Sequence, residues 1–348
     1  MRVGEARAAA RHWVATRAAG ESWFAGAYFS GSTVGLPDEA EVPLGSDTDV
    51  MVVTTLPEPP AKPGKFRHRG ALIEISPVPW SALASPEAVL SAYHLAGPFR
   101  TDTVIADPTG HLGRLRRDVA ARFAEPAWVR RRYGEARTRV ERGLAGLDPS
   151  APWPRQVMGW LFPTGVTTHV LLVAGLRNPT VRLRYLRTRE LLAEHGLAHA
   201  YPALLDPLGC AELTAERAEH HLHALAETFD ATAALARTPY PFSSDITRDA
   251  RPVAIDGTLR LIRAGHHREV VFWLLATAAR CHIILDADAT PAERDRHTPA
   301  FTGLLADLGL RTPADLRHRA RSTLARMPEL IETAEQLLAA RPPARQAP

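Results

Sequence analysis

The chain has 348 residues, of which 45% are hydrophobic and 23% charged, a balance typical of a soluble globular protein with one large or two ordinary domains. This composition excludes a disordered chain, a collagen and a coiled coil, and no uninterrupted apolar run reaches the ~20 residues needed to span a bilayer. The sequence has two cysteines, Cys210 and Cys281, so neither a disulfide scaffold nor a zinc cluster is expected. Residues 1–21 lack the apolar segment of a secretory signal. We therefore expect a cytoplasmic protein without a membrane segment.

The net charge of +4 comes from 42 basic and 38 acidic side chains that are spread along the chain. A weak positive excess favours small anionic substrates such as nucleotides, and a solvated arginine-rich surface is the alternative explanation. The sequence has no basic stripe with interleaved aromatic residues, which argues against a nucleic-acid partner.

The first 125 residues alternate between helix and strand signals. Short apolar runs bounded by Gly, Ser, Pro or Asp predict buried strands, and a wider periodicity of apolar residues predicts helices. In chain order we expect a helix over 1–22, strands over 23–29 and 46–53, a proline-rich loop over 57–70, a strand over 71–76, a helix over 81–95, a strand over 103–106 and a helix over 111–124.

From residue 126 the strand patterns stop, and helical periodicity interrupted by proline-rich turns continues to about residue 340. The helices expected are 127–146, 156–176, 180–195, 213–237, 253–284 and 313–340. The sequence thus predicts an α+β protein with a small mixed-sheet domain over 1–125, an all-helical bundle domain over 126–340 and a frayed tail over 341–348.

Three acidic residues mark the predicted sheet. Asp47 and Asp49 lie two apart on one strand, so their side chains leave the same face. Two neighbouring carboxylates repel each other, and a hard divalent cation such as Mg²⁺ would neutralise them. Glu74 interrupts an apolar strand and joins the pair if that strand lies beside the first. The alternatives are a solvated turn for the aspartates and a water-facing edge position for the glutamate.

Gly31 and Ser32 come at the end of the first predicted strand. A small pair at this point lets the backbone approach a phosphate, whose oxygens can accept hydrogen bonds from the N–H groups and from the Ser32 hydroxyl. A plain turn is the alternative. With the acids that follow, the sequence offers the groups needed for metal-assisted nucleotidyl transfer.

These motifs together resemble the nucleotidyltransferase superfamily typified by DNA polymerase beta. The resemblance is carried by Phe29-Ser30-Gly31-Ser32, Ser46-Asp47-Thr48-Asp49-Val50 and Ile73-Glu74-Ile75. A small catalytic domain followed by a helical substrate-binding domain also resembles the antibiotic nucleotidyltransferases, which act on aminoglycosides and similar molecules. The chain departs from the family at Val34-Gly35, where members often have Arg-Gly, and in a longer connector to Asp47.

The resemblance implies that Asp47, Asp49 and Glu74 hold two Mg²⁺ ions, and that Glu74 serves as or assists the general base. It also implies that Gly31, Ser32 and Ser46 contact the co-substrate, which is ATP or another nucleoside triphosphate. The acceptor would be a hydroxyl of a small polar molecule of the aminoglycoside kind, with pyrophosphate as the second product. Such a reaction would connect the protein with antibiotic resistance.

Arg182 and Arg189 are further candidates for contacts with the triphosphate. Asn178 and the proline after it form a good helix start, and the two arginines would then share one helix face. A solvated basic face is the alternative. Lys62 and Lys65 lie in the loop expected between the acid-bearing strands, from which they could reach a phosphate if the loop is not simply flexible.

Two other functions stay open at this point. The acceptor could be a protein hydroxyl or an RNA end, as in a toxin–antitoxin pair, or the chain could be a non-catalytic nucleotide-binding regulator. The complete set of three acids argues against the regulator. The sequence is compatible with a monomer and with a homodimer.

Overall fold

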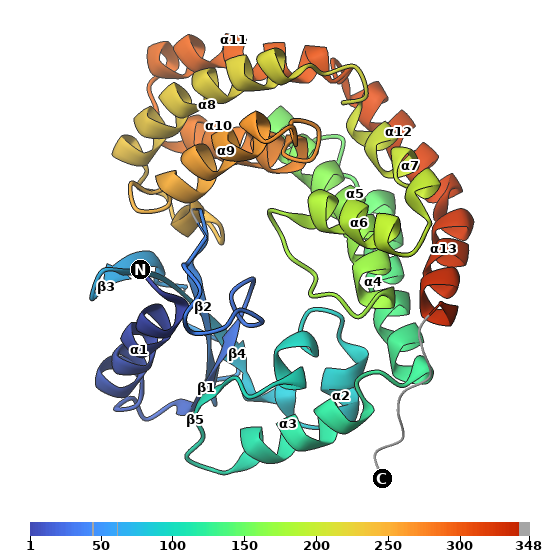
Figure 1. Cartoon of the computed structure of the whole chain (residues 1–348). Coiled ribbons are helices and arrows are strands. Elements are labelled where there is room, and N and C mark those ends of the chain that lie inside the picture. Colours follow the sequence, from blue (N-terminus) through green and yellow to red (C-terminus); the bar gives the residue numbers. More distant parts are fainter. Residues whose placement is uncertain (44, 61, 341–348) are drawn as a thin grey trace. The chain divides into compact units, whose positions relative to one another are not determined.

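The computed structural model describes residues 1–43, 45–60 and 62–340 and shows an α+β protein (Figure 1). The chain divides into two compact units. The first comprises Met1–Trp128 together with Pro239–Gly257, and the second comprises Val129–Thr238 and the residues from Thr258 onward. The sequence analysis placed 239–257 in the helical domain, whereas the structure joins this segment to the sheet. The tail predicted over 341–348 lies outside the described residues.

The first unit contains a five-stranded mixed sheet with the strand order β3-β4-β2-β1-β5. β2 and β4 run parallel, and the other neighbouring pairs run antiparallel. The parallel pair brings corresponding positions of the two acid-bearing strands side by side. The strands are β1 (Phe24–Ser30), β2 (Thr48–Thr54), β3 (Gly64–His68), β4 (Ala71–Pro79) and β5 (Val104–Ala106).

Strand β3 lies inside the segment 57–70 that the sequence analysis assigned to a loop, so the loop prediction is wrong for this strand. His68 pairs with Ala71, and only Arg69 and Gly70 connect β3 to β4. Both connecting residues have positive φ, 49° and 83°. Such a two-residue turn matches the twist of a hairpin and holds β3 firmly beside β4.

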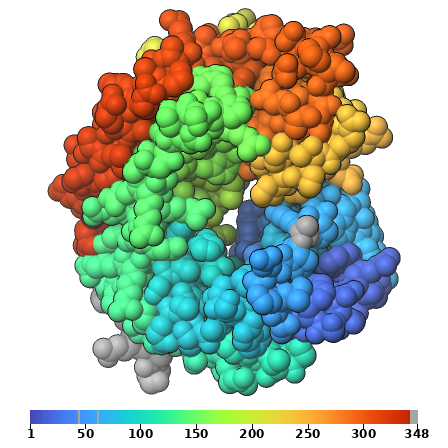
Figure 2. Space-filling model, turned by 180° about the vertical axis from the view of Figure 1, so that it is seen from behind, coloured from blue at the N-terminus to red at the C-terminus, as the bar shows by residue number. Residues whose placement is uncertain are grey.

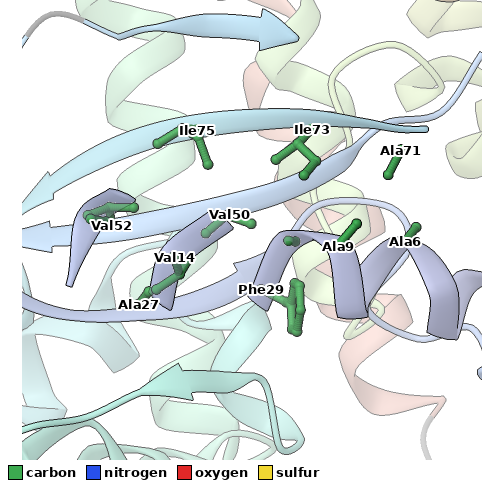
Figure 3. Packing of buried hydrophobic residues seen from close by; sticks show 12 residues of the cluster. Ala6, Ala9, Val14, Ala27, Phe29, Val50, Val52, Ala71, Ile73 and Ile75 are labelled. Atoms are coloured by element: carbon green, nitrogen blue, oxygen red, sulfur yellow. The ribbon is translucent and has the colours of Figure 1, made fainter. Parts of the chain in front are cut away.

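One face of the sheet packs against the first helix, as Figure 3 shows. α1 (Val3–Trp13) continues into a wider helical turn, η1 (Val14–Ala18), and ends earlier than the helix predicted over 1–22. Alternate residues of β1, β2 and β4 point towards this helix, whose alanines let it approach the strands. The buried cluster comprises Ala6, Ala9, Ala10, Val14, Ala18, Ala27, Phe29, Val50, Val52, Ala71, Ile73 and Ile75. The residues between these positions on the strands therefore leave the opposite face.

Further along the strands, this opposite face packs against short helices. Tyr28 of β1 contacts Phe99, with 4.8 Å between the ring centroids. A Cβ on Gly26 would lie 2.7 Å from Leu112 Cδ1, so glycine allows the close approach of the helix that carries Leu112. The helix predicted over 81–95 forms two shorter pieces instead. The elements are η2 (Trp80–Leu83), α2 (Pro86–Ser91), η3 (Gly97–Arg100) and α3 (His111–Arg122).

The second unit is helical. Its longer helices are α4 (Pro126–Ala145), α5 (Trp153–Ala174), α6 (Arg184–Glu194), α8 (Ala215–Leu235), α9 (Gly257–Arg263), α10 (Val271–Asp288), α11 (Pro291–Asp307), α12 (Pro313–Ala325) and α13 (Met327–Ala339). α5 and α10 are buried along most of their length. α12 and α13 lie along α5, and the red and green surfaces of Figure 2 show this packing. α4 crosses α5 so closely that a Cβ on Gly143 would lie 2.4 Å from Pro163 Cγ.

Helix α5 is, among the described residues, long and apolar enough to cross a membrane by length and composition. In the structure 78% of its most apolar window is buried. Burial on nearly all sides is also what the core helix of a globular unit shows. This helix therefore gives only weak evidence of a membrane span.

Several helix boundaries differ from those predicted. The helix expected over 180–195 begins at Arg184. The segment 253–284 forms η7 (Pro252–Asp256), α9 and α10 rather than one helix, and 313–340 divides into α12 and α13. The sequence analysis assigned no helix to the segment that forms α11, although Thr290 caps its start and Pro291 occupies its first position.

Candidate metal centre

Four polar residues form a row across the sheet on the face opposite to α1. Ser30 pairs with Asp49, Asp49 pairs with Glu74, and Glu74 pairs with Lys65. Residues that pair in this way project from the same face and lie about 5 Å apart. The register of four strands, rather than a loop, therefore sets the positions of these side chains.

Asp47 completes an acid triad with Asp49 and Glu74. One carboxylate oxygen of each residue lies within 4.8 Å of the others. The predicted convergence of the three side chains is confirmed, although β2 begins at Thr48 and not at Ser46. Among the described residues, no other group of three His, Cys, Asp or Glu side chains meets this spacing.

Gly31 makes room for Asp49. Its φ of 75° lies in the left-handed region, and a Cβ at this position would lie 1.6 Å from Asp49 Oδ2. The sequence analysis attributed Gly31 to a phosphate, whereas the structure gives it a reason within the protein. Ser32 is exposed in the turn, and Ser46 is half-buried, with its N–H donating to the Pro43 carbonyl at 2.9 Å. The contacts of Gly31, Ser32 and Ser46 with a nucleotide stay predictions.

Two lysines supply positive charge to the triad. Lys65 Nζ lies 3.0 Å from Asp47 Oδ2 and also donates to Glu74. Lys62 donates to the other oxygen of the Glu74 carboxylate. Lys65 belongs to β3 and its side chain is only 7% exposed, so the assignment of this residue to a loop is wrong.

Burial and the charges of the cluster together shift the pKa values of the acids in opposite directions. Burial raises the pKa of Asp49 well above its usual value, and the negative charges of Asp47 and Glu74 raise it further. Burial also raises the pKa of Asp47, against the effect of Lys65. Burial acts on Glu74 in the same sense, but Lys65 and Lys62 outweigh it and lower the pKa of Glu74 to about 2. The two lysines thus balance the negative charge of Glu74, whereas the negative charges of Asp47 and Asp49 are not fully balanced by them.

The donor set fits a hard divalent cation. Carboxylate oxygens are ligands of Mg²⁺, and its charge would offset the repulsion that disfavours ionised aspartates. The side chains of Asp47 and Glu74 are 13% and 9% exposed, so their repulsion is little screened by water. The triad could therefore hold a metal ion.

Arg182 and Arg189 belong to the second unit. Arg182 is half-buried in the turn before α6, so the two arginines do not share one helix as predicted. Arg189 Nη1 donates to Glu269 Oε1 at 2.7 Å, and the Tyr201 hydroxyl donates to the same oxygen at 3.1 Å. Arg189 thus has a structural partner in its own unit, and the contact of either arginine with a triphosphate stays a prediction.

Sequence reasoning missed Asp245, which lies between the helices predicted over 213–237 and 253–284. Its Oδ1 lies 2.9 Å from Lys65 Nζ. The two residues are 180 positions apart, and nothing in the local sequence around Asp245 indicates the contact. The only signal was the proline-rich character of the surrounding segment, which marks a break between helices.

Comparison of the chain with protein-family models, with curated proteins and with solved structures gives no match. The residues of the acid triad and their geometry are therefore the basis for a functional proposal.

Proposed function

We propose that the protein is a Mg²⁺-dependent nucleotidyltransferase that moves a nucleoside monophosphate, AMP from ATP in the first instance, to a hydroxyl of a small polar acceptor. The observation that carries this proposal is the convergence of Asp47, Asp49 and Glu74 on one face of adjacent strands. The turn at Gly31 and Ser32 directly beside Asp49 supports it, as does the motif resemblance to nucleotidyltransferases. An aminoglycoside-like acceptor rests on that resemblance alone.

The roles of the residues follow from their positions. Asp47, Asp49 and Glu74 would hold the two Mg²⁺ ions that the resemblance implies, and bound Mg²⁺ would neutralise phosphate charge and make the acceptor hydroxyl more acidic. Glu74, which is ionised at neutral pH, would accept a hydrogen bond from that hydroxyl and orient it. The acceptor oxygen then forms a bond to the α-phosphorus, its proton passes to a carboxylate, and the bond to pyrophosphate breaks.

The test is pyrophosphate release by the full chain with Mg²⁺, each of the four common nucleoside triphosphates, and a panel of aminoglycosides and related polar metabolites. Asp49→Asn and Glu74→Gln should each lower the rate on the order of 10³-fold while the circular dichroism spectrum is unchanged. Glu87→Gln is the matched control, because Glu87 is an exposed acid of the same unit that pairs with Arg122 at 2.8 Å. Equal rates in all four proteins would exclude the proposed site.

A second candidate is a nucleotide-binding protein without turnover. It is favoured by the buried ammonium group of Lys65, which already contacts two acids of the triad. Calorimetric binding of a nucleotide with no pyrophosphate released on any acceptor would select this candidate.

Intact-mass spectra of incubated protein and tRNA fractions would reveal a macromolecular acceptor by the added mass of one nucleotide.

A further inference from the structure

The segment 239–257 brings a fourth carboxylate to the acid triad. Its short helical turn η6 (Ser243–Asp245) lies against β3, and a Cβ on Gly64 would lie 2.8 Å from Ser244 Cβ. Asp245 Oδ1 lies 2.9 Å from Lys65 Nζ, and the Asp245 side chain is 15% exposed. This contact lies within the first unit, so it is part of the same compact body as the triad.

Lys65 is held by three carboxylates at once. Its ammonium group has three N–H donors, and its partners are Asp47, Glu74 and Asp245. The Lys65 ammonium group therefore lies at the place where a cation would bind the triad.

In the absence of a nucleotide, the formal charges of this cluster match one divalent cation. Four carboxylates, those of the triad and of Asp245, and the ammonium groups of Lys62 and Lys65 leave a formal charge of −2. With a divalent cation on the triad, Lys62 would still pair with Glu74, and Lys65 would still pair with Asp245. Every charge then has a counter-charge, provided that the Lys65 ammonium moves from the triad towards Asp245.

We propose that Lys65 is the counter-ion of the metal-free triad and that Asp245 retains the Lys65 ammonium group when a divalent cation binds the triad. Lys65 and Asp245 are thus positioning residues, which set how readily the cation enters. This inference rests on the metal site of the proposed function and does not depend on the nucleotide or on the acceptor.

The two residues have opposite effects on cation binding. Without the charge at position 65, the cation no longer competes with the ammonium group that contacts both Asp47 and Glu74, so Lys65→Gln and Lys65→Met should bind the cation on the order of tenfold more tightly. Asp245→Asn leaves Lys65 with two triad carboxylates as its charged partners, so this variant should bind the cation on the order of tenfold more weakly. Arg67→Met is the matched control, because Arg67 lies two residues further along β3 and its 3.9 Å contact with Asp249 is exposed.

The experiment measures Mn²⁺ binding by calorimetry and by electron paramagnetic resonance on the full chain without nucleotide. The double variant Lys65→Gln/Asp245→Asn should bind Mn²⁺ like Lys65→Gln alone, since Asp245 acts through the lysine. Thermal unfolding without Mn²⁺ should show a lower Tm for Lys65→Gln than for wild type, with the difference reduced at saturating Mn²⁺.

Three results would overturn the inference. Weaker Mn²⁺ binding by folded Lys65→Gln would make the lysine a support of the site and not a competitor. A double variant that binds far more weakly than Lys65→Gln would make Asp245 a ligand in its own right. Unchanged binding in Asp245→Asn would remove its role. The metal site itself is tested separately by Asp49→Asn. If this variant loses the Mn²⁺ affinity of wild type, the metal site is supported whatever the lysine variants do. If wild type does not bind Mn²⁺ at all, both proposals are overturned.

Discussion

Replacement of Gly31 by alanine tests whether Asp49 must lie where the sheet places it. A Cβ at position 31 would lie 1.6 Å from Asp49 Oδ2 and 2.5 Å from its Cγ, whereas real Cβ contacts essentially never fall below 3.0 Å. The carboxylate would have to turn away from the triad. Since misplacing a reacting group by about 1 Å costs ~100-fold in rate, we expect Gly31→Ala to lose at least that factor in nucleotidyl transfer and most of its Mn²⁺ affinity.

The backbone cost of this substitution can be separated from the clash. Gly31 has a φ of 75°, and Gly196 has a φ of 71° with no atom within 4 Å of the position of its Cβ. Alanine at either site carries the left-handed penalty of about 1–2 kcal/mol, and only Gly31→Ala also displaces a carboxylate. Gly196→Ala should therefore lose similar stability and keep its cation binding.

The assay combines urea denaturation, which reports the free energy of unfolding, with Mn²⁺ calorimetry and pyrophosphate release on the same preparations. If Gly31→Ala bound Mn²⁺ as tightly as Gly196→Ala does, the glycine would not be needed for the carboxylate, and the argument from close approach would be refuted.

Three further predictions concern the second unit. Arg189→Met should lower the free energy of unfolding by about 2 kcal/mol in urea denaturation, because it removes the charge partner of buried Glu269; a loss below ~0.5 kcal/mol would contradict this. Gly143→Ala should lower the free energy of unfolding by about 1–2 kcal/mol, because its methyl group would clash with α5, which crosses α4 at this point. Gly134→Ala on the same helix has open space around its methyl group and should raise the free energy of unfolding by up to about 1 kcal/mol. Equal shifts in Tm would disprove the close crossing. Burial lowers the pKa of His282 from 6.5 to about 4, so as the pH falls the imidazole is protonated in the unfolded chain before it is protonated in the folded one. The contribution of neutral His282 to stability is therefore complete above pH 6.5, and the free energy of unfolding falls by about 3 kcal/mol towards pH 4. His282→Leu should show a flatter pH dependence of unfolding over this range, and an unchanged one would count against the shift.

The acid triad could be predicted because each of its parts is a local signal. The spacing of Asp47 and Asp49 fixes their common face, and an acid within an apolar strand marks Glu74. Only the pairing of β2 with β4 was needed to join them, and the register places Asp49 beside Glu74. Strand alternation and pairing were thus sufficient for Asp49 and Glu74, whereas Asp47 joins them from the position just before β2.

The partners of the triad could not be predicted in the same way. Strand β3 is short and follows several prolines, and its turn uses Arg69 at a positive φ that non-glycine residues rarely adopt. The alternation within β3 was nevertheless present, since Phe66 packs against Trp13 while Lys65 leaves the other face. Asp245 carried no comparable signal, because a contact across 180 residues depends on tertiary structure alone.

The expected role of Arg189 shows how helical periodicity can mislead. The Thr180 N–H donates to the Asn178 carbonyl at 2.9 Å, so the chain makes a tight turn where a helix start was expected. Periodicity assigns a residue to a face, but it does not identify the partner on that face. Here the partner is Glu269, which lies 80 positions further along the chain.

The sheet unit is discontinuous along the chain, since residues 129–238 of the other unit separate its two segments. During translation the ribosome therefore releases all five strands well before the piece that carries Asp245. In a sheet that lacks this piece, Lys65 would have the triad carboxylates as its charged partners, as in the Asp245→Asn variant. By the inference above, the order of synthesis therefore delays tight cation binding until the last residue of the cluster, Asp245, has been made.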